Sequence, residues 1–241
     1  MDLFAADSSA NSLSIRRSAR AKRLQVRIFP HGHAEVVVPS RARAAEVAAF
    51  IAASQDWIEK TRIRAVGNGA AADLSLPVLI ELPAPGEAWQ VSYGQPGGRR
   101  RLREEAAPDG GRLIVAVPDP EARHLLRRWL SDRARYFLAG RVEAVAEETG
   151  LRPAGLSIRR QRTRWGSCTA GGRINLNCAA LFLSAALIDY LIVHELCHLR
   201  HMNHSRRFWA LVESFIPDFR HREDELADSW NRVPGWVFYG P

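Results

Sequence analysis

The chain has 241 residues, of which 46% are hydrophobic and 25% are charged. This balance is typical of a folded globular protein, and it excludes a collagenous, largely disordered or membrane-embedded chain. The three cysteines, Cys168, Cys178 and Cys197, form no C-x-x-C pair, and their odd number does not indicate a disulfide framework. A reducing compartment is therefore expected.

The net charge of +8 is concentrated at the two ends of the chain. Residues 1–70 carry 11 basic and 6 acidic side chains, residues 71–150 carry 11 and 12, and residues 151–241 carry 12 and 8. An acidic partner such as nucleic acid is compatible with this distribution. Because 32 of the 34 basic residues are arginine, a GC-rich genome explains the excess equally well, so nucleic acid stays open as a partner.

Neither a signal peptide nor a membrane span is expected. The N-terminal segment places acidic and small polar residues where a signal peptide needs a basic patch and an apolar run. The longest strongly apolar helix candidate, residues 187–199, is interrupted by Asp189, His194, Glu195 and His198, and it is too short to cross a bilayer. We therefore expect a cytoplasmic protein that has no membrane contact.

The first elements are expected after a flexible tail at residues 1–12. Alternating apolar and polar residues at 24–28 and 34–38 flank a short turn that contains proline and glycine, and they predict a β-hairpin. A helix is predicted from Ser40, a capping residue, to about residue 64. The small residues at 66–73 then predict a linker.

The middle of the chain consists of short β runs followed by one long helix. Runs at 77–82, 88–93, 99–103 and 112–117 are separated by glycine-containing turns and predict a small antiparallel sheet. At residue 119 the pattern changes, and apolar residues at helical spacing predict an amphipathic helix from about Glu121 to Gly150.

The last third of the chain begins with two predicted strands, residues 155–160 and 173–177. Ser184 can cap a further helix, whose apolar residues cover most of its circumference, so that this helix is expected to be central and buried. The elements together predict an α+β protein. Its parts are a tail at 1–12, an antiparallel β-rich subdomain with one helix at 13–118, and a helical catalytic core with a small sheet at 119–241.

Four of the eight histidines lie within residues 194–204. On a helix, His194 and His198 are rotated by only about 40° and separated by roughly 6 Å along the axis, so both imidazoles can reach one ion. Glu195 stands beside that ion. This H-E-x-x-H pattern predicts histidines that bind zinc and a glutamate that handles the proton of a metal-bound water.

A catalytic zinc usually has three protein ligands and one open position. If the helix continued, His201 would reach past the ion and His204 would face elsewhere. His204 becomes a ligand if the helix breaks after His201, where Asn203 can turn the chain and Ser205 can cap a new helix. We therefore predict His194, His198 and His204 as ligands, with His201 beside a ligand or the substrate.

This spacing is also that of the metzincins, except that His201 replaces their turn glycine. The opposing interpretation is a helix whose histidines are ordinary core residues. It would leave two histidines and a glutamate unpaired in an apolar environment, at a high cost in free energy. One Zn²⁺ ion per chain is therefore the predicted cofactor.

An open zinc position predicts hydrolysis. Zinc lowers the pKa of its bound water toward about 7, and Glu195 would accept the proton of that water as it attacks a carbonyl group. A cationic or hydroxyl-bearing side chain should face the resulting oxyanion. Arg164, Tyr190 and His201 are the candidates, and the choice among them is open.

Five short segments of the sequence resemble a known family. These segments are Arg164–Cys168, Ile174–Asn177, Val193–His198, Met202–Ser205 and Phe208–Leu211. They are similar to the YgjP-type metallopeptidase-like proteins, bacterial relatives of the WLM and SprT-like zincins. The resemblance runs from about residue 13 to 230 and is sharp from Arg159 to Val212. It implies a zincin-like metallopeptidase core with the same three ligands. It also suggests that the strand around Asn175 forms an edge of the cleft, where an extended peptide can add as a further strand.

The sequence thus predicts a zinc metallopeptidase that hydrolyses peptide bonds in a peptide or protein substrate, with Glu195 as general base. Two other functions stay open. One is a nucleotide (UTP-type) pyrophosphatase, an enzyme class that gathers carboxylates to bind Mg²⁺. The acidic cluster Glu223, Asp224 and Glu225 resembles a solvated helix face. The other is a basic nucleic-acid-associated module with a structural zinc. No oligomeric state is predicted.

Overall fold

The computed structural model describes residues 13–29, 32–66, 74–95 and 101–239. Contacts divide the chain into two units, Met1–Asp73 and Leu74–Pro241. The boundary falls at the end of the predicted linker, most of which lies outside the described residues. The domain boundary predicted from the sequence lies elsewhere, between residues 118 and 119, and that boundary stays a prediction.

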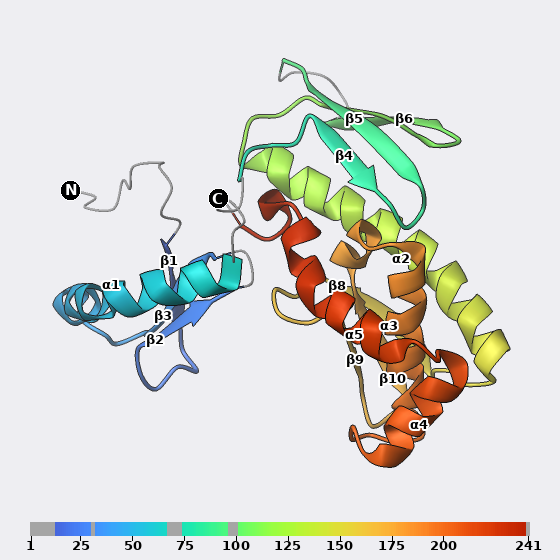
Figure 1. Ribbon diagram of the computed structural model, residues 1–241. Helices are drawn as coiled ribbons and strands as arrows, with labels where there is room; N and C mark the ends of the chain where they lie inside the picture. The colour runs from blue at the N-terminus through green and yellow to red at the C-terminus, as the bar shows by residue number, and fades with distance from the viewer. Residues whose placement is uncertain (1–12, 30–31, 67–73, 96–100, 240–241) are drawn as a thin grey trace. The chain divides into compact units, whose positions relative to one another are not determined.

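The first unit is a three-stranded sheet with one helix (Figure 1). Its strands β1 (Leu13–Ser18), β2 (Gln25–Ile28) and β3 (Ala34–Pro39) are arranged in the order β1-β3-β2. The predicted hairpin is confirmed, because β2 pairs with β3 in antiparallel register. β1 pairs with β3 in parallel register.

The core of this unit lies between one face of the sheet and helix α1 (Ala44–Val66). Val36 and Val38 of β3 pack with Val47 of the helix, as the alternation along the strand requires. The helix begins four residues after the predicted cap at Ser40. The backbone N–H of Arg43 donates instead to the carboxylate of Glu46 at 3.2 Å, half of a capping box, and this contact defines the first turn.

The second unit opens with a four-stranded sheet, which is mixed and not antiparallel as predicted. Its strands β4 (Leu79–Leu82), β5 (Glu87–Tyr93), β6 (Leu102–Ala107) and β7 (Gly110–Val115) are arranged in the order β4-β5-β7-β6. The last two strands form a hairpin, and β6 takes the edge of the sheet. β7 therefore lies next to β5 and pairs with it in parallel register.

Helix α2 (Glu121–Thr149) packs against this sheet. Trp129 meets Trp89 edge to face at 5.2 Å between ring centroids, and the Arg133 guanidinium Nε donates to Glu87 Oε2 at 2.8 Å. The helix ends where the sequence predicts, because Gly150 adopts a left-handed conformation with φ of 70°.

A second small sheet and helix α3 (Ala185–Cys197) form the part of the unit that carries the histidines. Strands β8 (Gly155–Arg159), β9 (Gly166–Cys168) and β10 (Arg173–Asn177) have the order β8-β10-β9. The short strand β9 was not predicted. β10 is therefore central, and β9 lies at an edge of the sheet.

A short 3₁₀ turn at Cys178–Phe182 precedes α3. Helices α4 (Arg206–Phe215) and α5 (Phe219–Asp228) and two further 3₁₀ turns, at Ser229–Arg232 and Gly235–Val237, follow the histidine segment. The described residues thus contain five α-helices and three sheets, which confirms the predicted α+β class. No helix in these ranges is both long and apolar enough to cross a bilayer.

Candidate metal centre

Helix α3 places the H-E-x-x-H residues in the interior of the second unit. Ser184 caps it as predicted, since its hydroxyl accepts the backbone N–H of Leu187 at 3.4 Å. The apolar residues Leu187, Ile188 and Ile192 are fully buried and hold the helix in the core. The last turn of α3 therefore carries His194 and Glu195 at a fixed position and orientation.

The helix ends earlier than the sequence analysis predicts. It stops at Cys197, and the next residues form a tight turn in which Leu199 and Arg200 donate to the carbonyls of Leu196 and Cys197 at 2.9 and 3.0 Å. The assigned helix thus ends before His201, whose N–H still donates to the carbonyl of Cys197 at 3.1 Å in an α-type hydrogen bond. A 3₁₀-type turn satisfies the last carbonyl groups of the helix, so that the chain can reverse before it reaches Asn203.

Three histidines meet beyond this turn. The ligand nitrogens of His194, His198 and His204 all lie within 4.8 Å of one another. His194 Nε2 and His204 Nε2 are 3.1 Å apart, although the two residues lie ten positions apart in the chain. Two nitrogens bound to a tetrahedral zinc ion at 2.0–2.1 Å are separated by about 3.3 Å, so this spacing fits a shared ion.

The orientation of His198 is fixed by a backbone group. Its Nδ1 lies 3.0 Å from the carbonyl oxygen of His201, and because a carbonyl can only accept, Nδ1 must carry the proton. The lone pair of His198 is then on Nε2. A hydrogen bond of this kind is the usual means of selecting the metal-binding nitrogen of a histidine. The backbone carbonyl of His201 thus orients the His198 ring. The sequence predicts His201 beside a ligand or the substrate but does not predict this backbone contact.

Two aromatic residues at the start of α4 form the wall behind the histidines. Phe208 is fully buried, and its ring lies 4.6–5.0 Å from the rings of His194, His198 and His204. Trp209 stacks on His204 at 5.5 Å. Sequence reasoning used these two residues only as a mark of resemblance and missed their contact with the site.

The apolar wall also sets the charge state of the histidines. Burial, followed by the neighbouring His198 and His204, lowers the pKa of His194 to about 3. Burial is also the main cause that lowers the pKa of His198. Both imidazoles are therefore neutral near pH 7, which is the form that binds a metal ion.

Glu195 is buried against a glycine of the neighbouring strand. The residue is 4% exposed. A Cβ atom placed on Gly166 of β9 would lie only 2.4 Å from Glu195 Oε1, so no side chain fits between the strand and the carboxylate. The glycine is needed for this close approach and not for its backbone angles, a role that the sequence alone does not reveal.

One oxygen atom of the Glu195 carboxylate lacks a polar partner among the described residues. This atom, Oε2, is buried. Burial raises the pKa of Glu195 to about 8, an effect that the positive charge of Arg164 partly opposes. A buried carboxylate without a partner, next to three imidazoles, fits a site that holds a cation and a polar ligand.

The segment Arg164–Cys168 attaches β9 to its surroundings. Trp165 Nε1 donates to the carbonyl oxygen of Leu226 at 3.1 Å, and its ring stacks on Trp230 at 4.1 Å. Ser167 Oγ accepts from Asn175 Nδ2 at 3.2 Å. The segment thus holds Gly166 firmly against the helix. Among the described residues, the side chains of Ser167 and Cys168 hydrogen-bond Asn175 and the carbonyl of Thr169, and neither bonds an acid-base group that would make it a nucleophile.

The structure brings only some of the predicted contact residues to the site. A hollow of about 270 Å³ opens at the histidines. Its lining consists of Arg164, Gly166, Ser167, Cys168, His194, Glu195, His198, Met202 and His204. Tyr190, His201 and Asn175 are absent from this lining.

Tyr190 and Asn175 have other surroundings. Tyr190 is 1% exposed and packs edge to face on His194 at 6.0 Å between ring centroids. Burial is the main cause that raises its pKa, with Glu223 and Asp224 adding to the effect. Asn175 lies on the central strand β10, so the edge of the sheet near the site is β9 and not the strand around Asn175.

Arg164 is held in place through its backbone. Asn177 is completely buried, and its amide nitrogen donates to the carbonyl oxygens of Gln161 and Arg164 at 2.6 and 2.8 Å. The side chain of Arg164 is exposed and lines the hollow. Of the three residues predicted to face an oxyanion, Arg164 is therefore the one whose side chain reaches the site.

Comparison with known proteins identifies the family. A family model described as YgjP-like, metallopeptidase domain, matches residues 22–229. The chain belongs to the YgjP-like metallopeptidase family. One similar solved structure is the crystal structure of the metallopeptidase zymogen of Pyrococcus abyssi abylysin, at 25% identity and a TM-score of 0.36 over 40% of this chain and 98% of that chain. No curated protein is significantly similar to the chain.

The described part of this YgjP-like metallopeptidase offers one group of side chains for a metal ion. Within residues 13–29, 32–66, 74–95 and 101–239, no group of three or more His, Cys, Asp or Glu residues other than the three histidines converges in this way. Glu225 of the acidic segment instead pairs with Arg232 at 3.3 Å. The carboxylates of α5 therefore form no second metal site.

We predict that Gly166→Ala lowers peptidase activity at least about tenfold and leaves the metal content unchanged. The added methyl group must displace the Glu195 carboxylate, whereas the histidines keep their positions. Activity on a fluorogenic peptide and bound metal should be measured together. Gly171→Ala is the matched control, because its Cβ meets no atom closer than 4.0 Å. Equal activity of the two variants would contradict the close approach.

We also predict that metal uptake at pH 7 releases about 0.9 proton from Glu195. Without a metal, a carboxyl group with a pKa near 8 is mostly protonated at this pH, and a bound cation favours its ionised form. His194 and His198 contribute no proton because their pKa values are lowered. Calorimetric titrations in buffers of different ionisation enthalpy measure the release. Glu195→Gln should lower the release by about 0.9 proton, and an unchanged release in that variant would contradict the assignment.

Proposed function

We propose that the protein is a zinc-dependent peptidase of the cytoplasm, in which His194, His198 and His204 hold one zinc ion. The convergence of these three side chains with Glu195 around one hollow is the observation that carries the proposal. Three imidazoles form a donor set that suits zinc and leaves a coordination position open. The three cysteines are free, as expected in a reducing compartment.

When bound, the zinc ion supplies a Lewis acid that polarises a carbonyl group and lowers the pKa of a water molecule. The contribution of the protein is a dry and rigid environment. Phe208 and Trp209 exclude water behind the histidines, and the carbonyl group of His201 fixes the ring of His198. Little reorganisation is then needed when the reaction begins.

Glu195 acts as the general base in this proposal. Its carboxylate lines the same hollow as the three imidazoles, and its Oε2 is available to accept a proton. The proton is then delivered to the leaving amine, so that one carboxyl group serves both halves of the reaction. Gly166 leaves just enough space for the carboxylate to take this position.

Arg164 is proposed to face the oxyanion that develops on the attacked carbonyl. Its side chain lines the hollow, and its charge acts on Glu195. A guanidinium group placed in advance near a developing negative charge stabilises the transition state more than the ground state. The bond from Asn177 to the Arg164 backbone keeps this segment in place.

The substrate is proposed to be an extended peptide that pairs with β9. This strand lies at an edge of its sheet, and its residues Gly166, Ser167 and Cys168 all line the hollow. The unpaired edge of a strand is a ready template for the main chain of a peptide. Such pairing recognises the backbone of the substrate and leaves its side chains to determine preference.

The main test compares peptide and nucleotide hydrolysis in the wild type and in Glu195→Gln. We expect zinc-loaded wild-type protein to cleave a denatured protein pool. Glu195→Gln should retain one zinc ion per chain and lose activity by about 10²–10⁴-fold, the usual contribution of a general base. Glu213→Gln on the exposed side of α4 is the matched control and should remain active.

Two results would contradict this function. Unchanged cleavage of protein by Glu195→Gln would exclude Glu195 as the base. Hydrolysis of nucleoside triphosphates in place of protein, with a requirement for Mg²⁺, would favour the pyrophosphatase alternative, which needs carboxylates that the described residues do not gather.

A further inference from the structure

A strongly basic segment outside the metal site lies on the N-terminal unit. Six of the sixteen residues from 13 to 28 are basic and none is acidic. They belong to strands β1 and β2 and to the turn that joins them. The YgjP-like catalytic chemistry uses none of these residues.

Strand alternation brings the basic residues to one face. Val36 and Val38 point toward α1, so their neighbour Val37 must point to the opposite face of the sheet. Arg16 and Gln25 stand opposite Val37 in the register of the sheet, and Arg27 stands opposite Glu35. Among the described residues of the first unit no helix covers this face, whereas α1 covers the other.

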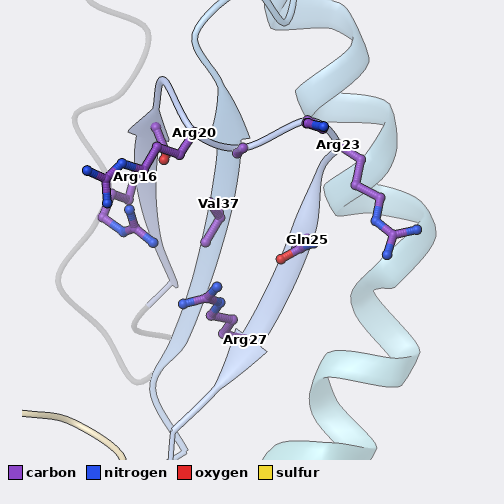
Figure 2. Close-up of a pocket in the computed structure, with 9 residues that line it drawn as sticks. Arg16, Arg20, Arg23, Gln25, Arg27 and Val37 are labelled. Carbon is purple, nitrogen blue, oxygen red and sulfur yellow. The ribbon is translucent and has the colours of Figure 1, made fainter. Parts of the chain in front are cut away.

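The open face is hollowed and lined by cations. The hollow has a volume of about 620 Å³. Its lining consists of Arg16, Ser18, Arg20, Ala21, Lys22, Arg23, Gln25, Arg27 and Val37. Figure 2 shows the guanidinium groups of Arg16 and Arg20 on the β1 side, Arg27 across the middle of the sheet and Arg23 beyond β2. We call this surface the basic face.

Most of the charge on the basic face is not neutralised. Arg16 donates to Glu35 at 3.0 Å. Arg20, Lys22, Arg23 and Arg27 are exposed, and none of them has an ion pair or hydrogen bond within the described residues. Like charges gathered on one surface repel each other, and an anionic ligand relieves this repulsion.

We propose that the basic face binds the phosphate backbone of double-stranded nucleic acid. Arginine predominates on it, and a guanidinium group suits bidentate contact with a phosphate. The cations are spread over the width of the sheet and do not converge on one point, as a site for a single small anion would require. A row of phosphates matches this spread.

The other residues that line the basic face argue for a duplex over a single strand or a lipid surface as the ligand. The hollow has no aromatic side chain, and stacking on aromatic rings is the main contact of proteins that bind single strands. Its apolar members are only Ala21 and Val37, and Val37 is buried, so nothing on this face can insert into a lipid bilayer. Contact with the backbone alone predicts binding to duplexes that does not depend on sequence.

The experiment measures the binding of full-length protein to a short duplex DNA of mixed sequence over a range of salt concentrations. Four unpaired cations that each neutralise one phosphate predict a slope of log K against log salt of about −3.6. Arg23→Gln combined with Arg27→Gln should make this slope shallower by about 1.8 and weaken binding at low salt at least about tenfold. Zinc content and peptidase activity should not change.

The matched control is Arg41→Gln combined with Lys60→Gln. Both residues are exposed in the same unit and lie outside the basic face, so the loss of charge is identical. We expect this control to bind duplex DNA within about twofold of the wild type. A second pair on the turn, Arg20→Gln with Lys22→Gln, should repeat the loss seen with the first pair, even if that first pair disturbs the sheet.

Several outcomes would overturn the proposal. Equal weakening in the control would assign binding to overall charge and not to this face. Tighter binding to single strands, or to vesicles with anionic headgroups, would assign the face to another class of ligand. Inorganic phosphate that displaces the duplex at millimolar concentration in a buffer of constant ionic strength would indicate a site for a single anion.

Discussion

The metal centre depends on a short turn that ends α3 early. Because the helix stops at Cys197, the chain can reverse and bring His204 Nε2 to 3.1 Å from His194 Nε2, with the ligand nitrogens of three imidazoles within 4.8 Å of one another. That arrangement is unfavourable without a cation or a proton between the nitrogens. Phe208 packs against all three rings, and burial lowers the pKa of His194 to about 3, so that the packing of apolar residues favours the form of His194 that binds a metal ion.

The position of Glu195, the proposed general base, rests on a second packing constraint. Glu195 is held between a helix and a strand that approach so closely that only glycine fits at residue 166. The strand is short, and Trp165 fastens it to the C-terminal segment through its hydrogen bond and its stacking on Trp230. Elements distant in sequence thus fix a carboxylate to the precision that proton transfer requires.

The sequence predicts the parts of this site that depend on local spacing. The cap at Ser184, the end of α2 at Gly150 and the α+β class follow from residue types and periodicity. The hydrogen bond that orients His198 could not be foreseen, because its partner is a backbone carbonyl and no side-chain pattern encodes it. The parallel pairing of β5 with β7 and the strand β9 were also missed, since both arise from contacts between distant segments. The role of Gly166 was missed for the same reason, because it depends on the contact of this residue with Glu195.

The central claim is that the imidazoles of His194, His198 and His204 hold the metal ion and that the nearby imidazole of His201 does not. The most direct measurement is the zinc affinity of His204→Ala beside that of His201→Ala. His204→Ala should lose affinity at least about 100-fold, more than the usual effect of altering a group that only supports a ligand. His201→Ala should keep one zinc ion per chain with nearly the affinity of the wild type, because its carbonyl group remains to orient His198. A loss of zinc in His201→Ala with normal binding in His204→Ala would contradict the account.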